Sequence, residues 1–192
     1  MTGKYAIKYV VTGGPSSGKT SLIKELAKLG YGTVPEAAEP IILDEKEKAK
    51  LDPTYDPILP ETHLGQFQEL VLEVQLLNEK KGELEYNIMF LDRSLVDGIA
   101  YAEHGSLDGN INLSDWFLDL VERQNYGIVF LLDQLPIFED SDYRHEDLEE
   151  AKRIHNKLEE VYRRMKYEVV NVPDLGLEGR AKYIVDYIQN KD

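Results

Sequence analysis

Gly13-Gly14-Pro15-Ser16-Ser17-Gly18-Lys19-Thr20 is the stretch of this sequence that decides its fold, because it satisfies the pattern G-x-x-x-x-G-K-[ST]. It follows an apolar, β-branched segment at residues 5–12 and precedes a segment at 21–29 with leucine and isoleucine at helical spacing. Glycines let successive backbone N–H groups converge on phosphate oxygens, and the N-terminus of the following helix adds partial positive charge. We therefore predict a phosphate-binding loop between a buried strand and a helix.

Two side chains of the loop suit a nucleoside triphosphate with Mg²⁺, so ATP and Mg²⁺ are the predicted ligands. Lys19 is expected to reach the β and γ phosphates, and Thr20 offers a hydroxyl to Mg²⁺, which prefers oxygen ligands. The alternative is a glycine-rich turn that binds nothing, and the agreement of loop and flanking elements argues against it. The residues predicted to bind nucleotide are Gly13, Gly14, Pro15, Ser16, Ser17, Gly18, Lys19, Thr20 and Ser21.

The rest of the chain predicts strands that alternate with helices. Apolar runs indicate strands at 5–12, 31–34, 86–91, 127–132 and 167–172. Helical spacing or composition indicates helices over 21–29, 36–50, 61–81, 94–104, 114–125, 148–165 and 180–188. Gly82 is expected to end the third of these helices, and Ser114 to be an N-cap.

Helices of this length between strands require right-handed crossovers and a parallel sheet. The predicted fold class is α/β: a three-layer P-loop NTPase fold with a five-stranded parallel sheet and helices on both faces. We find no composition shift within residues 1–192 and expect a single domain, with residues 134–146 as a candidate lid.

Composition and charge exclude several function classes. Asp and Glu number 36 against 22 Lys and Arg, a formal net charge of −14, so nucleic acid is not expected as a primary partner. There is no cysteine, which excludes disulfides, thiolate metal sites and cysteine nucleophiles. No apolar run reaches the length of a membrane span or resembles a signal peptide. We expect a soluble, cytoplasmic protein with no membrane partner.

Polar residues at the ends of the strands are the next candidates, because ligands of open α/β sheets bind beyond the carboxyl ends of the strands. Asp92 follows an apolar strand and has the position of a carboxylate that holds Mg²⁺; the alternative is a cap of the helix that begins at Ser94. Glu36 follows the second strand, where a general base for a hydroxyl substrate would lie; alternatively it only favours the dipole of the next helix.

Further motifs accompany the loop along the chain. They are Pro35-Glu36-Ala37-Ala38, Phe90-Leu-Asp-Arg-Ser94 with Asp97 and Tyr101, Val129-Phe-Leu-Leu-Asp133, Arg144 and Tyr167-Glu-Val-Val-Asn-Val-Pro173. With the loop, they resemble a family of small P-loop proteins described as AAA-like ATPase or kinase domains, which includes the nicotinamide riboside kinase domain of bacterial NAD regulators. The sequence is similar, more distantly, to deoxynucleoside and thymidylate kinases.

The resemblance implies phosphoryl transfer to a small hydroxyl compound. It implies that Glu36 is the base, that Arg93 lies near the acceptor and that Gln68 contacts it. Gln68 otherwise lies on a solvated flank of its helix. The resemblance, together with the expectation that a lid closes over the nucleotide, implies that Arg144 contacts the phosphates; the alternative is a surface ion pair. For Arg153, Arg163 and Arg164, a surface ion pair is the preferred interpretation.

Two functions compete on these grounds. The first is a small-molecule kinase that uses ATP and Mg²⁺, with Lys19, Glu36, Asp92, Arg93 and Arg144 as catalytic residues and an acceptor of nucleoside or riboside type. The second is a nucleotide-dependent regulatory ATPase that acts through a protein partner. A kinase must transfer phosphate when it is offered the right acceptor, whereas a switch must have different affinities in its ATP and ADP states.

Overall fold

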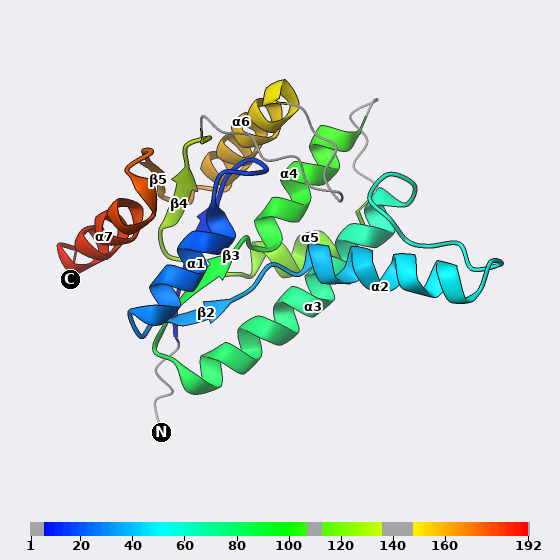
Figure 1. Ribbon diagram of the computed structural model, residues 1–192, viewed down its shortest axis with the longest axis horizontal. Helices are drawn as coiled ribbons and strands as arrows, with labels where there is room; N and C mark the ends of the chain where they lie inside the picture. The colour runs from blue at the N-terminus through cyan, green and yellow to red at the C-terminus, as the bar shows by residue number, and fades with distance from the viewer. Residues whose placement is uncertain (1–5, 107–112, 136–147, 192) are drawn as a thin grey trace.

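The computed structural model describes residues 6–106, 113–135 and 148–191. A central sheet contains five strands, and every strand pairing is parallel. Their order across the sheet is β2-β3-β1-β4-β5, with β1 in the middle (Figure 1). The strands are β1 (Ile7–Thr12), β2 (Gly32–Val34), β3 (Ile88–Asp92), β4 (Val129–Leu132) and β5 (Val169–Val172). The predicted α/β fold with a five-stranded parallel sheet is confirmed.

Seven helices lie within the described residues, and they connect or follow the strands. They are α1 (Lys19–Lys28), α2 (Ala38–Leu51), α3 (Leu64–Glu85), α4 (Leu95–Gly105), α5 (Asp115–Glu122), α6 (Leu148–Arg164) and α7 (Gly176–Gln189). Among these residues, no helix is long and apolar enough to cross a membrane. Figure 1 shows α2 extending away from the sheet, beyond the other helices.

Two apolar cores cover the two faces of the sheet, because neighbouring residues of a strand point to opposite faces. Val10 of β1 lies in the core that α3, α4, α5 and α6 complete. Its neighbour Val11 lies in the core that α1 and α7 complete. The molecule therefore has three layers, and β1 is buried from Tyr9 to Thr12, as the centre of a parallel sheet requires.

Two predicted features of helices differ from the structure. The helix predicted to stop at Gly82 continues to Glu85. A Cβ at Gly82 would lie 2.5 Å from the sulfur of Met89, so this glycine allows α3 to pack closely on β3 and does not end the helix. Ser114 is the N-cap residue of α5, as predicted, but its side chain makes no capping hydrogen bond.

The parallel register brings the candidate residues to one edge of the sheet. Val11 of β1 pairs with Asp92 of β3, and Val34 of β2 pairs with Leu91. The loop after β1, the residues after β3 and Glu36 after β2 therefore leave neighbouring strands at the same edge. Beyond the carboxyl ends of such strands lies the usual ligand site of an open α/β sheet.

Candidate functional site

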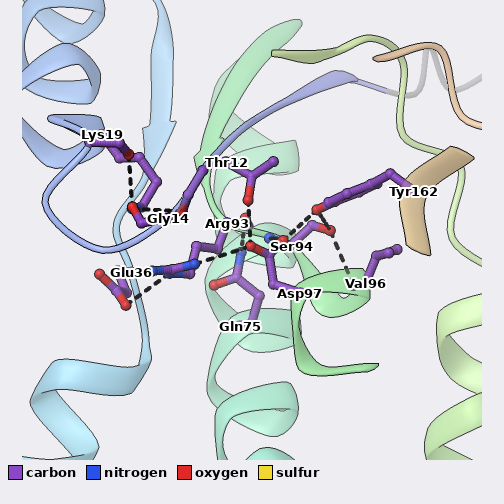
Figure 2. A network of polar contacts seen from close by, with 12 residues as sticks. Thr12, Gly14, Lys19, Glu36, Gln75, Arg93, Ser94, Val96, Asp97 and Tyr162 are labelled. Atoms are coloured by element: carbon purple, nitrogen blue, oxygen red, sulfur yellow. Dashed lines mark hydrogen bonds and ion pairs between the residues drawn. The ribbon is translucent and has the colours of Figure 1, made fainter. Parts of the chain in front are cut away.

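The phosphate loop lies between β1 and α1, as its sequence requires. Gly18, the residue before α1, has φ of 87°, a left-handed conformation that glycine adopts without the cost of a side chain. Lys19 opens the helix and is buried; its Nζ donates hydrogen bonds to the carbonyl oxygens of Gly13 and Gly14, at 3.1 and 2.9 Å. The ammonium therefore lies within the curve of the loop, where phosphate oxygens held by the loop's N–H groups would meet it (Figure 2).

Arg180 of α7 supports this loop, a role that nothing in the sequence indicates. Its guanidinium donates hydrogen bonds to three backbone carbonyls: those of Ser17 and Asp133, each at 2.7 Å, and that of Pro173 at 3.1 Å. The three acceptors follow β1, β4 and β5 in the chain. Arg180 therefore ties the phosphate loop to the ends of two other strands.

Thr20 and Asp92 form a pair of oxygen ligands beside the loop. The Thr20 hydroxyl donates to Oδ2 of Asp92 at 2.9 Å, while Oδ1 of Asp92 is buried and has no hydrogen-bond partner within the described residues. Burial and the nearby Glu36 carboxylate raise the pKa of Asp92. A buried, unpartnered carboxylate oxygen next to a hydroxyl fits Mg²⁺, which takes a few protein oxygens and fills its other positions with phosphate and water.

No cluster of three or more metal-ligating side chains occurs in the part of the chain that the structure describes. The helix after β3 is capped by Ser94, whose Oγ accepts from the backbone N–H of Val96 at 3.2 Å. The role of a helix cap, which was the alternative for Asp92, therefore belongs to Ser94.

Arg93 follows Asp92 and turns towards Glu36 and Asp97. Its φ of 71° is unusual for a residue with a side chain, and such backbone strain is often found at functional sites. Its Nε lies 3.0 Å from Oε1 of Glu36, and its Nη1 lies 3.3 Å from Oδ1 of Asp97. The guanidinium carbon lies 5.0 Å from the centre of the Tyr101 ring. Arg93 is therefore held by two carboxylates and an aromatic ring.

Asp97 is the centre of a buried network that sequence reasoning did not identify. Its carboxylate accepts from Thr12 Oγ1 at 2.6 Å, from the backbone N–H of Ser94 at 3.0 Å, and from the hydroxyl of Tyr162 (Figure 2). The Ser-x-x-Asp spacing is typical of a capping box and was a signal for the contact with Ser94. The partners from β1 and α6, Thr12 and Tyr162, left no such signal.

A cavity of about 380 Å³ lies next to Glu36 and Arg93. Its walls come from the start of α2, from α3 and from α4. It is lined by Glu36, Ala37, Ala38, Glu39, Ile42, Pro60, Glu61, Leu64, Phe67, Gln68, Val71, Gln75, Arg93, Ser94, Asp97, Gly98 and Tyr101. Its size falls within the range of small-molecule sites, and its mixture of apolar walls with a few polar groups is typical of them.

Gln68 lines this cavity and is only 5% exposed, so the alternative of a solvated flank does not hold. Its amide makes no hydrogen bond to any residue within 6–106, 113–135 and 148–191. Helical spacing alone could not place it, because spacing identifies the apolar stripe of α3 but not the neighbour that covers its flank.

The predicted lid falls largely outside the described residues, and Arg144 lies outside them as well. Gln134 is described, and its amide donates to the carbonyl of Pro15 in the phosphate loop at 2.8 Å. The other arginines form surface ion pairs, as was preferred from the sequence. Their pairs are Arg153 with Glu150, Arg163 with Glu159, and Arg164 with Glu103 and Glu160.

Residues 8–180 match the profile of a family described as an AAA domain. No curated protein sequence matches the chain. Among solved structures, the chain is similar to NadR protein in complex with NR, with a TM-score of 0.68 and 18% identity over 97% of this chain and 51% of the other. The chain thus spans about half the length of the NadR chains that it matches.

Two smaller kinases are similar over nearly their whole length. Thymidylate kinase from Candida albicans has a TM-score of 0.68 and 14% identity, over 97% of this chain and 92% of that one. Deoxyadenosine kinase from M. mycoides has a TM-score of 0.63 and 16% identity, over 96% of this chain and all of that one. At such identities the similarity establishes the fold, and the predicted P-loop NTPase fold and its family are confirmed.

Proposed function

This chain belongs to the AAA domain family, and on that premise we propose that it is an ATP- and Mg²⁺-dependent kinase that phosphorylates a small hydroxyl compound of nucleoside or riboside type. The observation that carries this proposal is the cavity of about 380 Å³ that includes Glu36 and Arg93. Arg93 directly follows Asp92, which accepts a hydrogen bond from Thr20 of the phosphate loop. A regulatory ATPase that acts through a protein partner has no need of a second enclosed site. NR, the ligand named for a NadR structure, and the name of deoxyadenosine kinase support the class of acceptor.

In this proposal the loop residues 13–21 hold the triphosphate through backbone N–H groups, and Lys19 contacts its β and γ phosphates. Thr20 and Asp92 hold Mg²⁺, which supplies positive charge to the phosphate oxygens when it is bound. The unpartnered Oδ1 of Asp92 is the structural feature that supports this assignment.

Glu36 is the proposed general base. It takes the proton of the acceptor's hydroxyl while that oxygen bonds to the γ-phosphorus and the bond from phosphorus to the β-phosphate oxygen breaks, which releases ADP. Arg93 holds the Glu36 carboxylate through Nε and faces the acceptor cavity. Asp97 accepts a hydrogen bond from Arg93 and three more from other groups, so its oxygens are committed to positioning and not to proton transfer.

The experiment is a transfer assay with ATP, Mg²⁺ and a panel of nucleosides and ribosides, in which phosphorylated product is measured directly. We expect slow ATP hydrolysis without acceptor and product formation with one class of acceptor. Asp92→Asn should shift the Mg²⁺ requirement to higher concentrations. ATP hydrolysis that no acceptor changes, together with partner binding that differs between the ATP and ADP states, would favour the regulatory ATPase.

A further inference from the structure

The charged side chains around the proposed acceptor cavity indicate which net charge its ligand carries. We propose that Glu39 and Glu61, at the mouth of the cavity, make it selective for acceptors without negative charge, so that it excludes phosphomonoesters such as nucleoside 5′-monophosphates. This rests on the proposed function, in which the cavity holds the acceptor. It deepens that function, because the similar kinases act on both phosphorylated and unphosphorylated compounds by their names.

The described residues that line the cavity include four carboxylates and a single basic side chain, Arg93. Arg93 already lies against two of these carboxylates, at 3.0 Å from Glu36 and 3.3 Å from Asp97. The other two, Glu39 and Glu61, are exposed, and neither forms an ion pair with a residue that the structure describes. Among the residues that the structure describes, the lining therefore has more negative than positive side chains.

The cavity also carries a separate sign of a ligand. Gln68 is 5% exposed, faces the cavity and has no hydrogen-bond partner among the described residues. The nitrogen and oxygen of this amide are open to the cavity, so a ligand with polar groups can form hydrogen bonds with them. Phe67, Leu64 and Val71 supply apolar surface around it. Such walls suit a flat ring with polar groups on its edge and no negative charge.

A phosphomonoester would carry about two negative charges at neutral pH into this setting, close to the γ-phosphate of ATP and to Asp92. Like charges oppose binding, although solvent and salt screen the exposed Glu39 and Glu61 more than the buried Asp97. Specificity often arises from such repulsion against the wrong ligand. A neutral or cationic acceptor meets no such opposition. We expect kcat/KM for a nucleoside to exceed that for its 5′-monophosphate by about a hundredfold, from the combined repulsion by the lining carboxylates and the γ-phosphate of ATP.

The test compares thymidine and cytidine with their 5′-monophosphates. Binding is measured by calorimetry while the phosphate loop is saturated with AMP-PNP and Mg²⁺, so that the monophosphates cannot occupy the ATP site, and transfer is measured separately with ATP. A cationic riboside is included as a third charge state. We expect binding of the neutral or cationic compounds and weak or undetectable binding of the monophosphates.

Glu39→Gln, Glu61→Gln and the double variant remove charge at nearly constant shape. Each variant should lower the ratio of kcat/KM for the nucleoside to kcat/KM for its monophosphate, because the monophosphate binds more tightly. The ratio should fall by about threefold to tenfold for a single change and more for both. Glu47→Gln, an exposed carboxylate further along α2 and outside the cavity, is the matched control and should leave the ratio unchanged. Thermal melting of each variant checks whether Glu39 acts only on the dipole of α2.

The outcomes separate this inference from the proposed function. If monophosphates bind or react as well as nucleosides, charge selection is wrong while the kinase proposal stands. If nucleosides bind and monophosphates do not, but no phosphate is transferred, charge selection stands and the kinase proposal fails. If neither class binds, or if the ratio is the same in the Glu39→Gln and Glu61→Gln double variant, the inference is overturned.

Discussion

The phosphate loop and the proposed acceptor cavity are linked through Asp92 and Arg93, yet they are built in opposite ways. The loop is a continuous run of residues 13–20, and its ligands are mainly backbone N–H groups with one lysine and one hydroxyl. The cavity takes its lining from α2, α3, α4 and the three segments that precede them, and its polar groups are side chains. In the proposed function, the backbone of the loop recognises phosphate, which every nucleoside triphosphate carries, whereas the side chains of the cavity select the acceptor.

Lys19→Ala tests the loop and should have the largest effect. The variant removes the ammonium that lies among the carbonyls of the loop without changing the apolar core, so turnover should fall by about a hundredfold to a thousandfold. Calorimetry with ATP and Mg²⁺ should show weaker binding. Lys24→Ala, on the exposed face of the same helix, is the control. Unchanged ATP affinity and turnover in Lys19→Ala would exclude the loop as the nucleotide site.

Glu36→Gln tests whether the two regions divide their roles. The amide oxygen can still accept the hydrogen bond from Arg93, but it cannot take a proton, so transfer should fall by about a hundredfold while ATP affinity stays within about twofold. Asp92→Asn should instead change the dependence on Mg²⁺. Equal loss of ATP binding in both variants would show that Glu36 serves the nucleotide and not the acceptor.

Tyr162→Phe tests whether the cavity depends on α6. The change removes one of the four hydrogen-bond donors to Asp97 and keeps the ring in the core, so Arg93 should be held less firmly. We expect a loss of about 1 to 3 kcal/mol in the free energy of unfolding, the cost of a hydrogen bond to a buried charged group. We also expect kcat/KM for the acceptor to fall by about tenfold with unchanged ATP affinity.

Tyr126→Phe is the matched control for this variant. Tyr126 is buried in the same core, and its hydroxyl donates to Glu79 and accepts from the backbone N–H of Leu95, but makes no hydrogen bond to Asp97. The Tyr126→Phe protein should have a lower free energy of unfolding but the same KM for the acceptor. If both tyrosine variants alter acceptor kinetics to the same extent, the Asp97 network supports the core in general and does not position Arg93.

The smallest expected effect is on the pH dependence of stability, and it comes from His155, which lies near Lys19 of the phosphate loop. Burial lowers the pKa of His155, which lies near Lys19, Asp133 and Glu159. In the unfolded chain the imidazole takes up a proton below about pH 6.5, whereas in the folded protein it stays neutral to lower pH. The unfolded state therefore binds more protons in this range, and stability falls as pH falls.

The measurement for His155 is the melting temperature of the wild type and of His155→Gln between pH 7.5 and 5. Below about pH 6.5, the melting temperature of the wild type should fall more steeply with decreasing pH than that of the variant. Nucleoside binding in the cavity should show no such difference between the two proteins. Parallel pH curves for both proteins would contradict the buried, neutral imidazole.

Much of the fold follows from the sequence. The order of strands and helices along the chain was predicted correctly for the described residues, because an apolar run or a helical spacing is a local property of the chain. Gly82 shows the limit of local reasoning. Glycine favours the end of a helix when nothing opposes it, but here the close approach of Met89 required a glycine within α3.

The sequence by itself predicted the proposed nucleotide half of the site, because its chemistry lies in eight consecutive residues whose conformation the glycines allow. It also indicated the carboxylates that follow β2 and β3, since parallel strands share one carboxyl edge. It indicated neither the burial of Gln68 nor the arrangement of Asp97 with its partners.

Tertiary structure alone decided those features, because they depend on contacts between distant segments. Tyr162 and Asp97 are 65 positions apart, and Arg180 reaches the carbonyl of Ser17 across 163 positions. The periodicity of a helix shows which face is apolar, but the packing of that helix on the sheet selects which polar flank meets a cavity and which meets solvent. The acceptor half of the site is therefore a product of packing, whereas the phosphate half is a product of local backbone conformation.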